Sequence, residues 1–532
     1  MAFGQYEALT RRHEFILWLA LLGLAALLRF GSVPAGLPYI TYVDEGHVLH
    51  PSIEILKARS FDTGRFTYPP LTSYLTTIAA KAYSPIYRLV HHHTLGQDLP
   101  RDEDYHTGLG ENYDLITPPE IILLGRLVVA CLSLGTVVLA GVMAKQFAGA
   151  RAGLLAMVFV ALCPALVSRG SIAIIDTTAA FFAAATLYFC QRLRTQARWS
   201  DAALAGIAAG LAAAGKYTVG VVFISVCITI AMLQIASRSK ALLGLASIGG
   251  LVAGILGGVP AALLHPAKII AELRAQAAFY QTIRSDQPYW AVALSGSEIG
   301  ILLALAALFG LALMLRNRAT RGAAIAWLGF GILLLSVVAW PSFQPFRNLL
   351  SLVPLVCIAA AFFFEQIWLH LEHRGMSRRL LAATLALLLF TIPLAWFSGL
   401  YLEGRLKHVD SRVLAIDWLR QHVSKEETIL GIREIAILPT EWQRISAKVT
   451  VVSWFQAADL LERQRFDYVV AGEFDLRYAT DAALWSAYRD RWTKVVSNMP
   501  MEANFGVVST PVIPYLWRTN DQLVVIRRGT PR

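Results

Sequence analysis

Eleven apolar stretches recur between residues 15 and 400, and their length restricts the fold of this chain more than any other property of the sequence. A helix needs about 20 mostly apolar residues to cross the roughly 30 Å hydrocarbon core of a membrane, and shorter helices are accepted among neighbours. The stretches are 15–33, 121–142, 152–168, 174–191, 201–215, 217–236, 241–264, 297–315, 322–340, 348–368 and 379–400. They predict a multi-pass α-helical membrane protein with about 11 transmembrane helices.

The distribution of charge divides the chain in two. Residues 1–400 hold 49 charged side chains (12%) and residues 401–532 hold 34 (26%), against roughly 25% in soluble proteins. We therefore expect a transmembrane domain over 1–400 and an ordinary soluble domain over 401–532. This pattern excludes a single soluble globular protein, a disordered chain and a disulfide-stapled secreted module.

The basic residues indicate the orientation of the chain in the membrane and do not indicate nucleic-acid binding. The net charge is +11, but most Lys and Arg lie in short runs between apolar stretches, and such runs accumulate on the cytoplasmic side of a membrane. With eleven helices and a cytoplasmic N-terminus, one side receives Arg11/Arg12, Lys145/Arg151, Arg192/Arg194/Arg198, Arg238/Lys240, Arg316/Arg318/Arg321 and Arg374/Arg378/Arg379. The sequence thus predicts an N-terminus inside, a C-terminus outside and no nucleic-acid partner.

This topology leaves three large segments outside the membrane, namely a first loop over 34–120, a second loop over 265–296 and the C-terminal domain. Within the first loop, residues 68–90 are moderately apolar. If they crossed the membrane, every later basic cluster would change sides, so we expect helices that lie on the outer surface there. The first apolar stretch is interpreted as an uncleaved signal anchor.

The C-terminal domain has an α/β pattern. A helical pattern in SRVLAIDWLRQHV is followed by four short apolar runs, ETILGI, KVTVVSW, FDYVVAGEF and QLVVIRR, with helical patterns between them. We expect a small three-layer sandwich, placed outside the cytoplasm.

Adjacent acids, Asp44 and Glu45, follow the first apolar stretch on the outer side. Adjacent carboxylates at a membrane surface can serve as a general base and as a partner that positions substrate or metal. The simpler interpretation is that the pair caps the helix that begins near His47, because Asp is favoured at helix starts.

Asp176 is the only acidic residue between Ile121 and Ser200, and the predicted topology puts it on the same face as Asp44 and Glu45. An ionisable group at the mouth of a transmembrane helix is costly and indicates function. Its alternative is again a helix cap, since Thr177 and Thr178 follow it.

Basic side chains recur on the same face, at Arg169, Lys216 and Arg347. Several cations beside acids at one membrane surface suit a lipid-linked phosphate or pyrophosphate, held while chemistry proceeds at the group it carries. The alternative is that these side chains only extend toward lipid headgroups.

Histidines offer weak metal candidates. His91, His92 and His93 are adjacent, and consecutive residues rarely converge on one ion. His47 and His50, three apart on a predicted helix beside Glu45, are a better pair, although no third ligand is evident. A divalent metal therefore stays open, and no other cofactor is indicated.

Five segments together resemble a known family. They are the acid pair at Asp44–Glu45, FTYPPLTSYL at 66–75, SRGSIAIID ending at Asp176, GKYT at 215–218 and FRNLLSLVPL at 346–355. Their order and spacing are similar to those of the GT-C glycosyltransferases, in the family 39 group that includes protein O-mannosyltransferases and the lipid A aminoarabinose transferase. The tail resembles the outer C-terminal domain that many prokaryotic members carry.

The resemblance implies an enzyme that transfers a sugar from a polyprenyl-phosphate donor to an acceptor hydroxyl or phosphate, with inversion, on the outer face of the cell inner membrane. Asp44 would be the general base, supported by Glu45, and Asp176 would orient acceptor or sugar. Lys216 and Arg347 would hold the donor phosphate, with three further substrate contacts expected at Arg169, Tyr68 and His265. The sugar and the acceptor, whether lipid, glycan or protein, are not implied.

One segment departs from the family pattern, since the polar run over 91–114 has no counterpart in the better-known relatives. A polytopic transporter or lipid flippase is the competing interpretation, because about a dozen helices and intramembrane charges suit it equally. Against it, the acids gather at one face rather than at the midplane. A non-catalytic assembly scaffold would leave Asp44, Glu45 and Asp176 unexplained.

Overall fold

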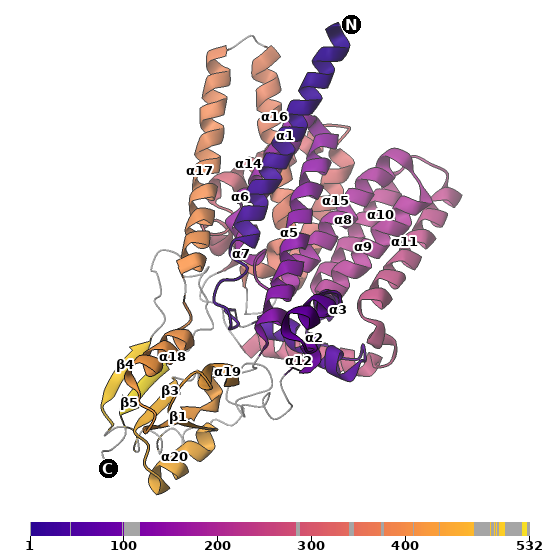
Figure 1. Ribbon diagram of the computed structural model, residues 1–532. Helices are drawn as coiled ribbons and strands as arrows, with labels where there is room; N and C mark the ends of the chain where they lie inside the picture. Colours follow the sequence, from indigo (N-terminus) through magenta and orange to yellow (C-terminus); the bar gives the residue numbers. More distant parts are fainter. Residues whose placement is uncertain are drawn as a thin grey trace. The chain divides into compact units, whose positions relative to one another are not determined.

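The computed structural model describes residues 2–42, 44–97, 99, 117–282, 288–339, 345–373, 377–407, 409–435, 437–472, 490, 494, 496, 499–505 and 524–528 (Figure 1). The chain forms two compact units, and each is treated by itself below. The helical unit comprises Met1–Val33, Pro51–Ala82 and Leu123–Leu406. The α/β unit comprises Pro34–His50, Tyr83–Ile122 and Lys407–Arg532, so the division falls inside two helices of the first loop, α2 (Glu45–Ala58) and α3 (Leu71–His91).

Most helices of the helical unit correspond to the apolar stretches, and those over 266–293 lie in the predicted second loop. The helical unit is a bundle of long and short helices. They are α1 (Ala2–Phe30), α5 (Pro119–Ala148), α6 (Ala150–Leu162), α7 (Pro164–Arg169), α8 (Ile175–Gln196), α9 (Trp199–Gly215), α10 (Phe223–Met232), α11 (Ser237–Gly258), α12 (Pro266–Thr282), α13 (Tyr289–Ala293), α14 (Ile301–Arg316), α15 (Arg321–Val338), α16 (Val353–His373) and α17 (Ser377–Lys407). Short 3-10 turns join them at η2 (Tyr217–Val222), η3 (Pro260–Leu263) and η4 (Phe346–Leu352).

Each of the eleven predicted stretches lies on one or two of these helices. Among the described residues, six helices are long and apolar enough to cross a membrane, namely α1, α5, α11, α15, α16 and α17, and three apolar segments are shorter, α6, η2 with α10, and α14. Helix α8 is rich in Ala and Thr and mostly buried by its neighbours, so it does not need a lipid-like surface. The total of eleven membrane-crossing helices stays a prediction.

Glycines line the close contact of α9 with α11, which lie side by side in Figure 1. Gly206 and Gly210 on α9 face Gly250 and Gly254 on α11, and each pair is spaced by four residues, so its members share one helix face. A Cβ atom at any of the four would lie 2.0–2.3 Å from a backbone atom of the opposite helix. Only hydrogen fits in this contact, and the resulting close approach replaces side-chain interdigitation.

A buried arginine is satisfied within the same bundle. Arg29, near the end of α1, is fully buried, and its guanidinium donates to Ser133 Oγ at 2.7 Å and to the carbonyl oxygens of Val160 and Ala161 at 3.0 and 3.2 Å. The carbonyls at the end of α6 lack intrahelical donors. The bonds from Arg29 therefore satisfy both the buried guanidinium and these carbonyl oxygens.

The α/β unit is built on a five-stranded sheet with the order β2-β1-β3-β5-β4. Its strands are β1 (Thr428–Ile432), β2 (Lys448–Val452), β3 (Tyr468–Gly472), β4 (Met501–Phe505) and β5 (Val524–Arg528). The first three pair in parallel, and β5 runs antiparallel to both β3 and β4. Helix α18 (Ser411–His422) packs on β4 and β5, and α20 (Trp454–Arg463) packs on β1. Three short turns complete the unit, η1 (Leu95–Gln97), η5 (Arg433–Ile435) and α19 (Pro439–Trp442).

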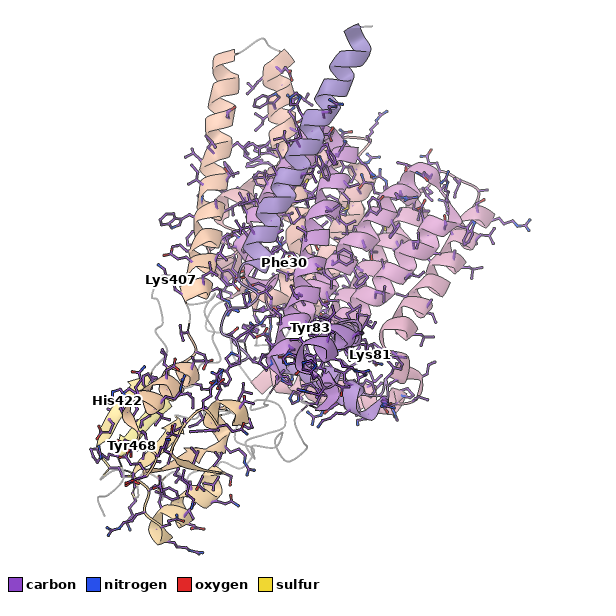
Figure 2. The ribbon with its side chains drawn as sticks, viewed as in Figure 1. Phe30, Lys81, Tyr83, Lys407, His422 and Tyr468 are labelled. Carbon is purple, nitrogen blue, oxygen red and sulfur yellow. The ribbon has the colours of Figure 1, made fainter. Side chains whose placement is uncertain are left out.

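The core of this unit is apolar and includes Leu419, Ile429 and Val470, and an aromatic contact lies at its edge. Trp418 on α18 stacks on His422 with ring centroids 4.4 Å apart and meets Tyr468 of β3 edge-on at 6.1 Å; His422 and Tyr468 are labelled in Figure 2. The four predicted apolar runs contain β1, β2, β3 and β5, and the predicted helix contains α18. The sequence analysis missed β4, because MEANF lacks the β-branched residues typical of strands. The domain boundary at residue 401 stays a prediction, and α17 runs on to Lys407.

We expect Gly250→Ala to lower the stability of the bundle, because its new methyl would lie 2.2 Å from the carbonyl oxygen of Ala203 and force the helices apart. Overpacking of this kind costs about 1–3 kcal/mol. The matched control is Gly249→Ala on the same helix, which has no atom within 4 Å of the added carbon. Thermal unfolding in detergent should show a loss for the first variant only, and equal stability of the two would contradict the close contact.

Candidate active site

The centre of the candidate site is the ammonium of Lys216. Its Nζ lies 2.6 Å from Asp176 Oδ1 and donates to Asn348 Oδ1, also at 2.6 Å. The Asp176 carboxylate is 4% exposed and the Lys216 side chain 15%, so the ion pair is nearly enclosed, with the lysine the more accessible partner. Two of the sequence candidates are therefore brought into direct contact.

The geometry of this pair follows from where two helices begin and end. Asp176 lies in the first turn of α8, where the helix dipole favours a negative charge. Lys216 directly follows the last residue of α9, and its backbone is extended. Gly215 makes the approach close, because a Cβ there would lie 3.0 Å from the backbone nitrogen of Ala179 on α8. Gly215 thus allows α9 to approach α8, and Lys216, the next residue, reaches Asp176 at the start of α8.

Asn348 extends the cluster into the core. Its Nδ2 donates to the Tyr289 hydroxyl at 2.9 Å, and that hydroxyl donates to the carbonyl oxygen of Val338 at 3.1 Å. An amide whose nitrogen is held in this way presents its oxygen to Lys216 in a fixed orientation. Arg347 directly precedes Asn348 in η4 and is half-buried.

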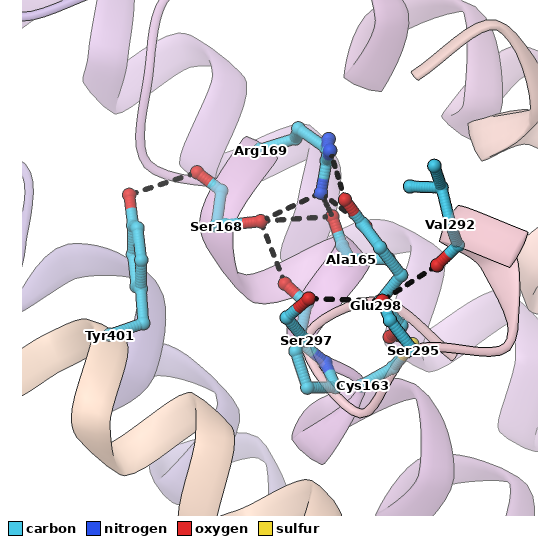
Figure 3. A network of polar contacts seen from close by, with 10 residues as sticks. Cys163, Ala165, Ser168, Arg169, Val292, Ser295, Ser297, Glu298 and Tyr401 are labelled. Carbon is cyan, nitrogen blue, oxygen red and sulfur yellow. Dashed lines mark hydrogen bonds and ion pairs between the residues drawn. The ribbon is translucent and has the colours of Figure 1, made fainter. Parts of the chain in front are cut away.

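Arg169 is held by an acid that the sequence analysis did not select. Its Nη1 and Nη2 lie 2.6 Å from Glu298 Oε2 and Oε1, a bidentate pair with the glutamate 1% exposed (Figure 3). The guanidinium also donates to Ser168 Oγ at 3.0 Å and lies 5.7 Å from the centre of the Phe346 ring. A phosphate would reach Arg169 only in competition with Glu298.

The backbone ahead of Asp176 is fixed by several hydroxyls. Tyr401 on α17 donates to the carbonyl oxygen of Ser168 at 3.0 Å and shares a hydrogen bond with Ser171 Oγ at 2.9 Å. Thr177 Oγ1 donates to the carbonyl oxygen of Arg169 at 2.7 Å. Because α7 has only six residues, these bonds and not the helix itself hold the turn that leads into α8.

The FTYPPLTSYL segment is held at its start. Glu272 on α12 accepts from the backbone N–H of Phe66 at 2.5 Å and from Thr67 Oγ1 at 3.0 Å. Tyr217, next to Lys216, donates to the carbonyl oxygen of Phe66 at 3.0 Å. The segment and the GKYT turn are therefore neighbours, and Tyr68 lies half-buried two residues beyond Phe66.

His265 pairs with an acid of the first loop. Its Nε2 lies 2.7 Å from Asp62 Oδ2, and both side chains are partly exposed. The backbone N–H of Gly64 and then His265 hold the pKa of the Asp62 carboxyl below its usual range, so Asp62 is ionised at neutral pH. The sequence analysis expected a substrate contact at His265, and in the structure this side chain joins the first and second loops through Asp62.

Asp44 and Glu45 belong to the α/β unit. Asp44 directly precedes α2 and is 9% exposed, while Glu45 is the first residue of the helix and fully buried. Glu45 Oε2 accepts from the backbone N–H of Thr41 at 3.1 Å, which closes the turn that carries Asp44. The cap-like position expected as the simpler interpretation is thus present, and Glu45 has a structural task.

The metal candidates lie on α2, with His47 half-buried and His50 buried. In the part of the chain that the structure describes, no group of three or more His, Cys, Asp or Glu side chains is placed to hold a metal ion. Most of the unusual polar run over 91–114 lies outside the described residues. Its start is described, and there His91 stacks on Tyr87 with ring centroids 4.1 Å apart.

Three contributors escaped the sequence analysis. Glu298 carried a usable signal, because it is the only acidic residue between Asp286 and Glu365. Asn348 stands beside the selected Arg347, but an amide is a weaker signal than a charge. Glu272 lies in a loop with ordinary charge content, so nothing in the sequence distinguished it.

Replacement of Glu298 by Gln should destabilise the helical unit, because it leaves the Arg169 guanidinium without its counter-charge. Removing one partner of a buried pair costs about 3 kcal/mol or more. Glu372→Gln is the matched control, since Glu372 pairs with Arg151 in an exposed position where such pairs contribute up to about 1 kcal/mol. Unfolding curves in detergent that show equal losses would contradict a structural role for the Arg169–Glu298 pair.

Two comparisons bear on this architecture. Residues 122–259 match the family model described as dolichyl-phosphate-mannose-protein mannosyltransferase. No curated protein matches the sequence. Residues 122–259 include Arg169, Asp176 and Lys216, so the match covers the central ion pair.

Solved structures extend the likeness to nearly the whole chain. ArnT from Cupriavidus metallidurans in the apo state is 14% identical, with a TM-score of 0.54 over 96% of this chain and 97% of that one. The same protein bound to undecaprenyl phosphate gives 13% identity and a TM-score of 0.53 over 96% and 98%. The oligosaccharyltransferase AglB from Archaeoglobus fulgidus, in complex with an inhibitory peptide and a dolichol-phosphate, is 10% identical, with a TM-score of 0.50 over 87% and 70%. The resemblance to the GT-C glycosyltransferases is therefore confirmed, in sequence over residues 122–259 and in fold over nearly the whole chain.

Proposed function

We propose that this protein is an integral-membrane glycosyltransferase that takes its sugar from a polyprenyl-phosphate donor and passes it to an acceptor hydroxyl or phosphate outside the cytoplasm. The observation that carries the proposal is the enclosed Lys216–Asp176–Asn348 cluster, of which Asp176 and Lys216 lie within the region matched by the mannosyltransferase family model. Neighbours in fold are solved with undecaprenyl phosphate or dolichol-phosphate, which supports a lipid phosphate as the donor headgroup.

Lys216 would act on the leaving group. The bond between the anomeric carbon and the phosphate oxygen breaks during transfer, and negative charge grows on the lipid phosphate. A cation whose position is already fixed stabilises that charge without reorganisation, which is why preorganised charges are effective in catalysis. Asp176 and Asn348 supply the preorganisation, and the Lys216 side chain keeps some accessibility for the phosphate. We place Arg347, next to Asn348, as the second phosphate contact.

Asp44 would act on the acceptor. Its carboxylate accepts the proton of the acceptor hydroxyl as the oxygen forms a bond to the anomeric carbon, while the lipid phosphate departs from the opposite face, so the configuration is inverted. Glu45 supports this role indirectly, because it binds the backbone of Thr41 and fixes the turn. Tyr68 and His265 are proposed sugar or acceptor contacts, and the bidentate pair with Glu298 favours a structural role for Arg169.

Asp44→Asn should abolish most of the transfer while leaving the fold intact, because the amide has the shape of the carboxylate and cannot accept the proton. General-base catalysis contributes about 10²–10⁴-fold, so kcat should fall by at least about 10²-fold. Transfer of labelled sugar from synthetic polyprenyl-phosphate donors to membrane extracts measures this, with Asp417→Asn, an exposed acid of α18, as the control. Residual turnover near that of the wild type would remove Asp44 as the base.

Lys216→Met should weaken both donor binding and transfer, because it removes the charge and keeps the length of the side chain. Loss of one preorganised donor lowers kcat by about 10²–10³-fold. Lys240→Met is the matched control, since Lys240 is exposed and its Nζ donates to a backbone carbonyl, that of Ala231. A normal rate for Lys216→Met would refute its role at the phosphate.

The same assay separates the classes of function. Transfer by the wild type, lost in Asp44→Asn, establishes the transferase and identifies the acceptor by where the label is found. Donor binding without transfer to any extract would favour a lipid transporter instead. Parallel reactions with a chelator decide whether a divalent metal takes part.

A further inference from the structure

We propose that Tyr39 and Arg412 form a clamp through which the C-terminal part of the α/β unit positions Asp44. The inference rests on the proposed function, because it concerns the orientation of the proposed base. It assigns the C-terminal part a task in the reaction itself, apart from selecting the acceptor or shielding a cavity. Both residues belong to the same compact unit, although 373 positions of sequence separate them.

The first half of the clamp is a rigid cation. Arg412 lies in the first turn of α18, and its guanidinium nitrogens Nε and Nη2 lie 2.8 and 2.7 Å from the two carboxylate oxygens of Asp410. Asp410 is also the N-cap of α18, since Oδ1 accepts from the backbone N–H of Arg412 at 2.9 Å. Asp410 and Arg412 are 1% and 4% exposed. The guanidinium plane is therefore fixed by the helix that carries it.

The second half is a buried aromatic ring. The Arg412 guanidinium carbon lies 3.9 Å from the centre of the Tyr39 ring, well within the range for a cation–π contact. Tyr39 is 4% exposed, and its hydroxyl lies 3.5 Å from the backbone nitrogen of Leu438. Burial raises the pKa of Tyr39, so the ring remains a neutral phenol at any physiological pH. Such desolvated cation–π contacts are the strong ones.

Local hydrogen bonds hold the backbone on both sides of the few residues that separate the ring from the proposed base. The backbone N–H of Tyr39 donates to the carbonyl oxygen of Gly36 at 2.9 Å. Two residues further along the chain, the backbone N–H of Thr41 donates to the carboxylate of Glu45 at 3.1 Å. The N–H of Glu45 in turn donates to the carbonyl oxygen of Tyr42 at 3.0 Å. Asp44 lies inside this turn, five residues after Tyr39, and we expect a shift of the Tyr39 ring to move the backbone that carries its carboxylate.

Such a clamp is useful because the reaction rate depends steeply on the position of the reacting groups. Displacement of a reacting group by about 1 Å can cost about 10²-fold in rate. Asp44 lies at the end of a loop that enters a helix, and a helix start by itself is free to fray. A fixed cation on a ring five residues earlier restrains that start from outside the helix.

The test compares Arg412→Lys and Tyr39→Leu with two matched controls. Arg412→Lys keeps the charge but loses the planar stack and the bidentate pair, and Tyr39→Leu removes the ring. Tyr39→Phe keeps the ring face and loses only the long hydroxyl contact, whereas Arg420→Ala removes an exposed arginine of the same helix that pairs with Asp417. In full-length protein, amide exchange over residues 36–45 should rise about tenfold in the two clamp variants. Both controls should exchange like the wild type.

The kinetic readout separates positioning from folding. In the clamp variants kcat should fall by about 10-fold to 100-fold while donor KM stays unchanged, and Tyr39→Phe should keep the wild-type rate. Unchanged exchange over 36–45, or faster exchange with an unchanged kcat, would overturn the clamp. Absence of transfer by the wild type would instead refute the proposed function, and the exchange data would still decide whether the clamp holds the segment.

Discussion

The cost of an unpaired charge in an apolar bundle governs the helical unit more than any other constraint. The three cations at Arg29, Arg169 and Lys216 each meet a partner at hydrogen-bond distance, and each partner comes from a different element: helix α5, the loop before α14, and helix α8. Because a buried group that loses its partner is far more costly than the pair is favourable, these contacts fix which helix ends can meet. Polar groups therefore fix the positions of the helices relative to one another. The glycine contact of α9 with α11 sets how closely these two helices pack.

The same constraint distinguishes two kinds of cation near the candidate site. Arg169 is bidentate with an almost fully buried glutamate, and both carboxylate oxygens are used. Lys216 touches one oxygen of Asp176 and a neutral amide, and an ammonium has three donors. The first arrangement is closed and supports the backbone before α8. The second is a preorganised charge that an anion can still approach, which is the property that the proposed chemistry requires.

Much of the fold could be predicted because membrane helices and charge runs leave a strong record in sequence. The eleven apolar stretches lie on helices, and Asp176 and Lys216 were expected on one face, although the sequence did not indicate that they form an ion pair. The partners were harder to predict. Glu298 and Asn348 become relevant only when a loop before α14 and the start of η4 meet α7 and α9, and no periodicity encodes such contacts. The turn at Thr41 that occupies Glu45 is a local contact between residues four apart, which the acid pair by itself did not indicate.

Tyr401 gives α17 a mechanical part in the helical unit. This helix presents Leu389, Ile392 and Trp396 at its surface, each more than half exposed, while the hydroxyl of Tyr401 further along binds Ser168 and Ser171. Since these bonds hold the backbone that runs into Asp176, a force that tilts α17 is transmitted to the first turn of α8 through two hydrogen bonds. If the apolar surface of α17 lies against lipid, as its length and composition allow, bilayer thickness and lateral pressure would act on this helix and through it on the Lys216–Asp176 pair.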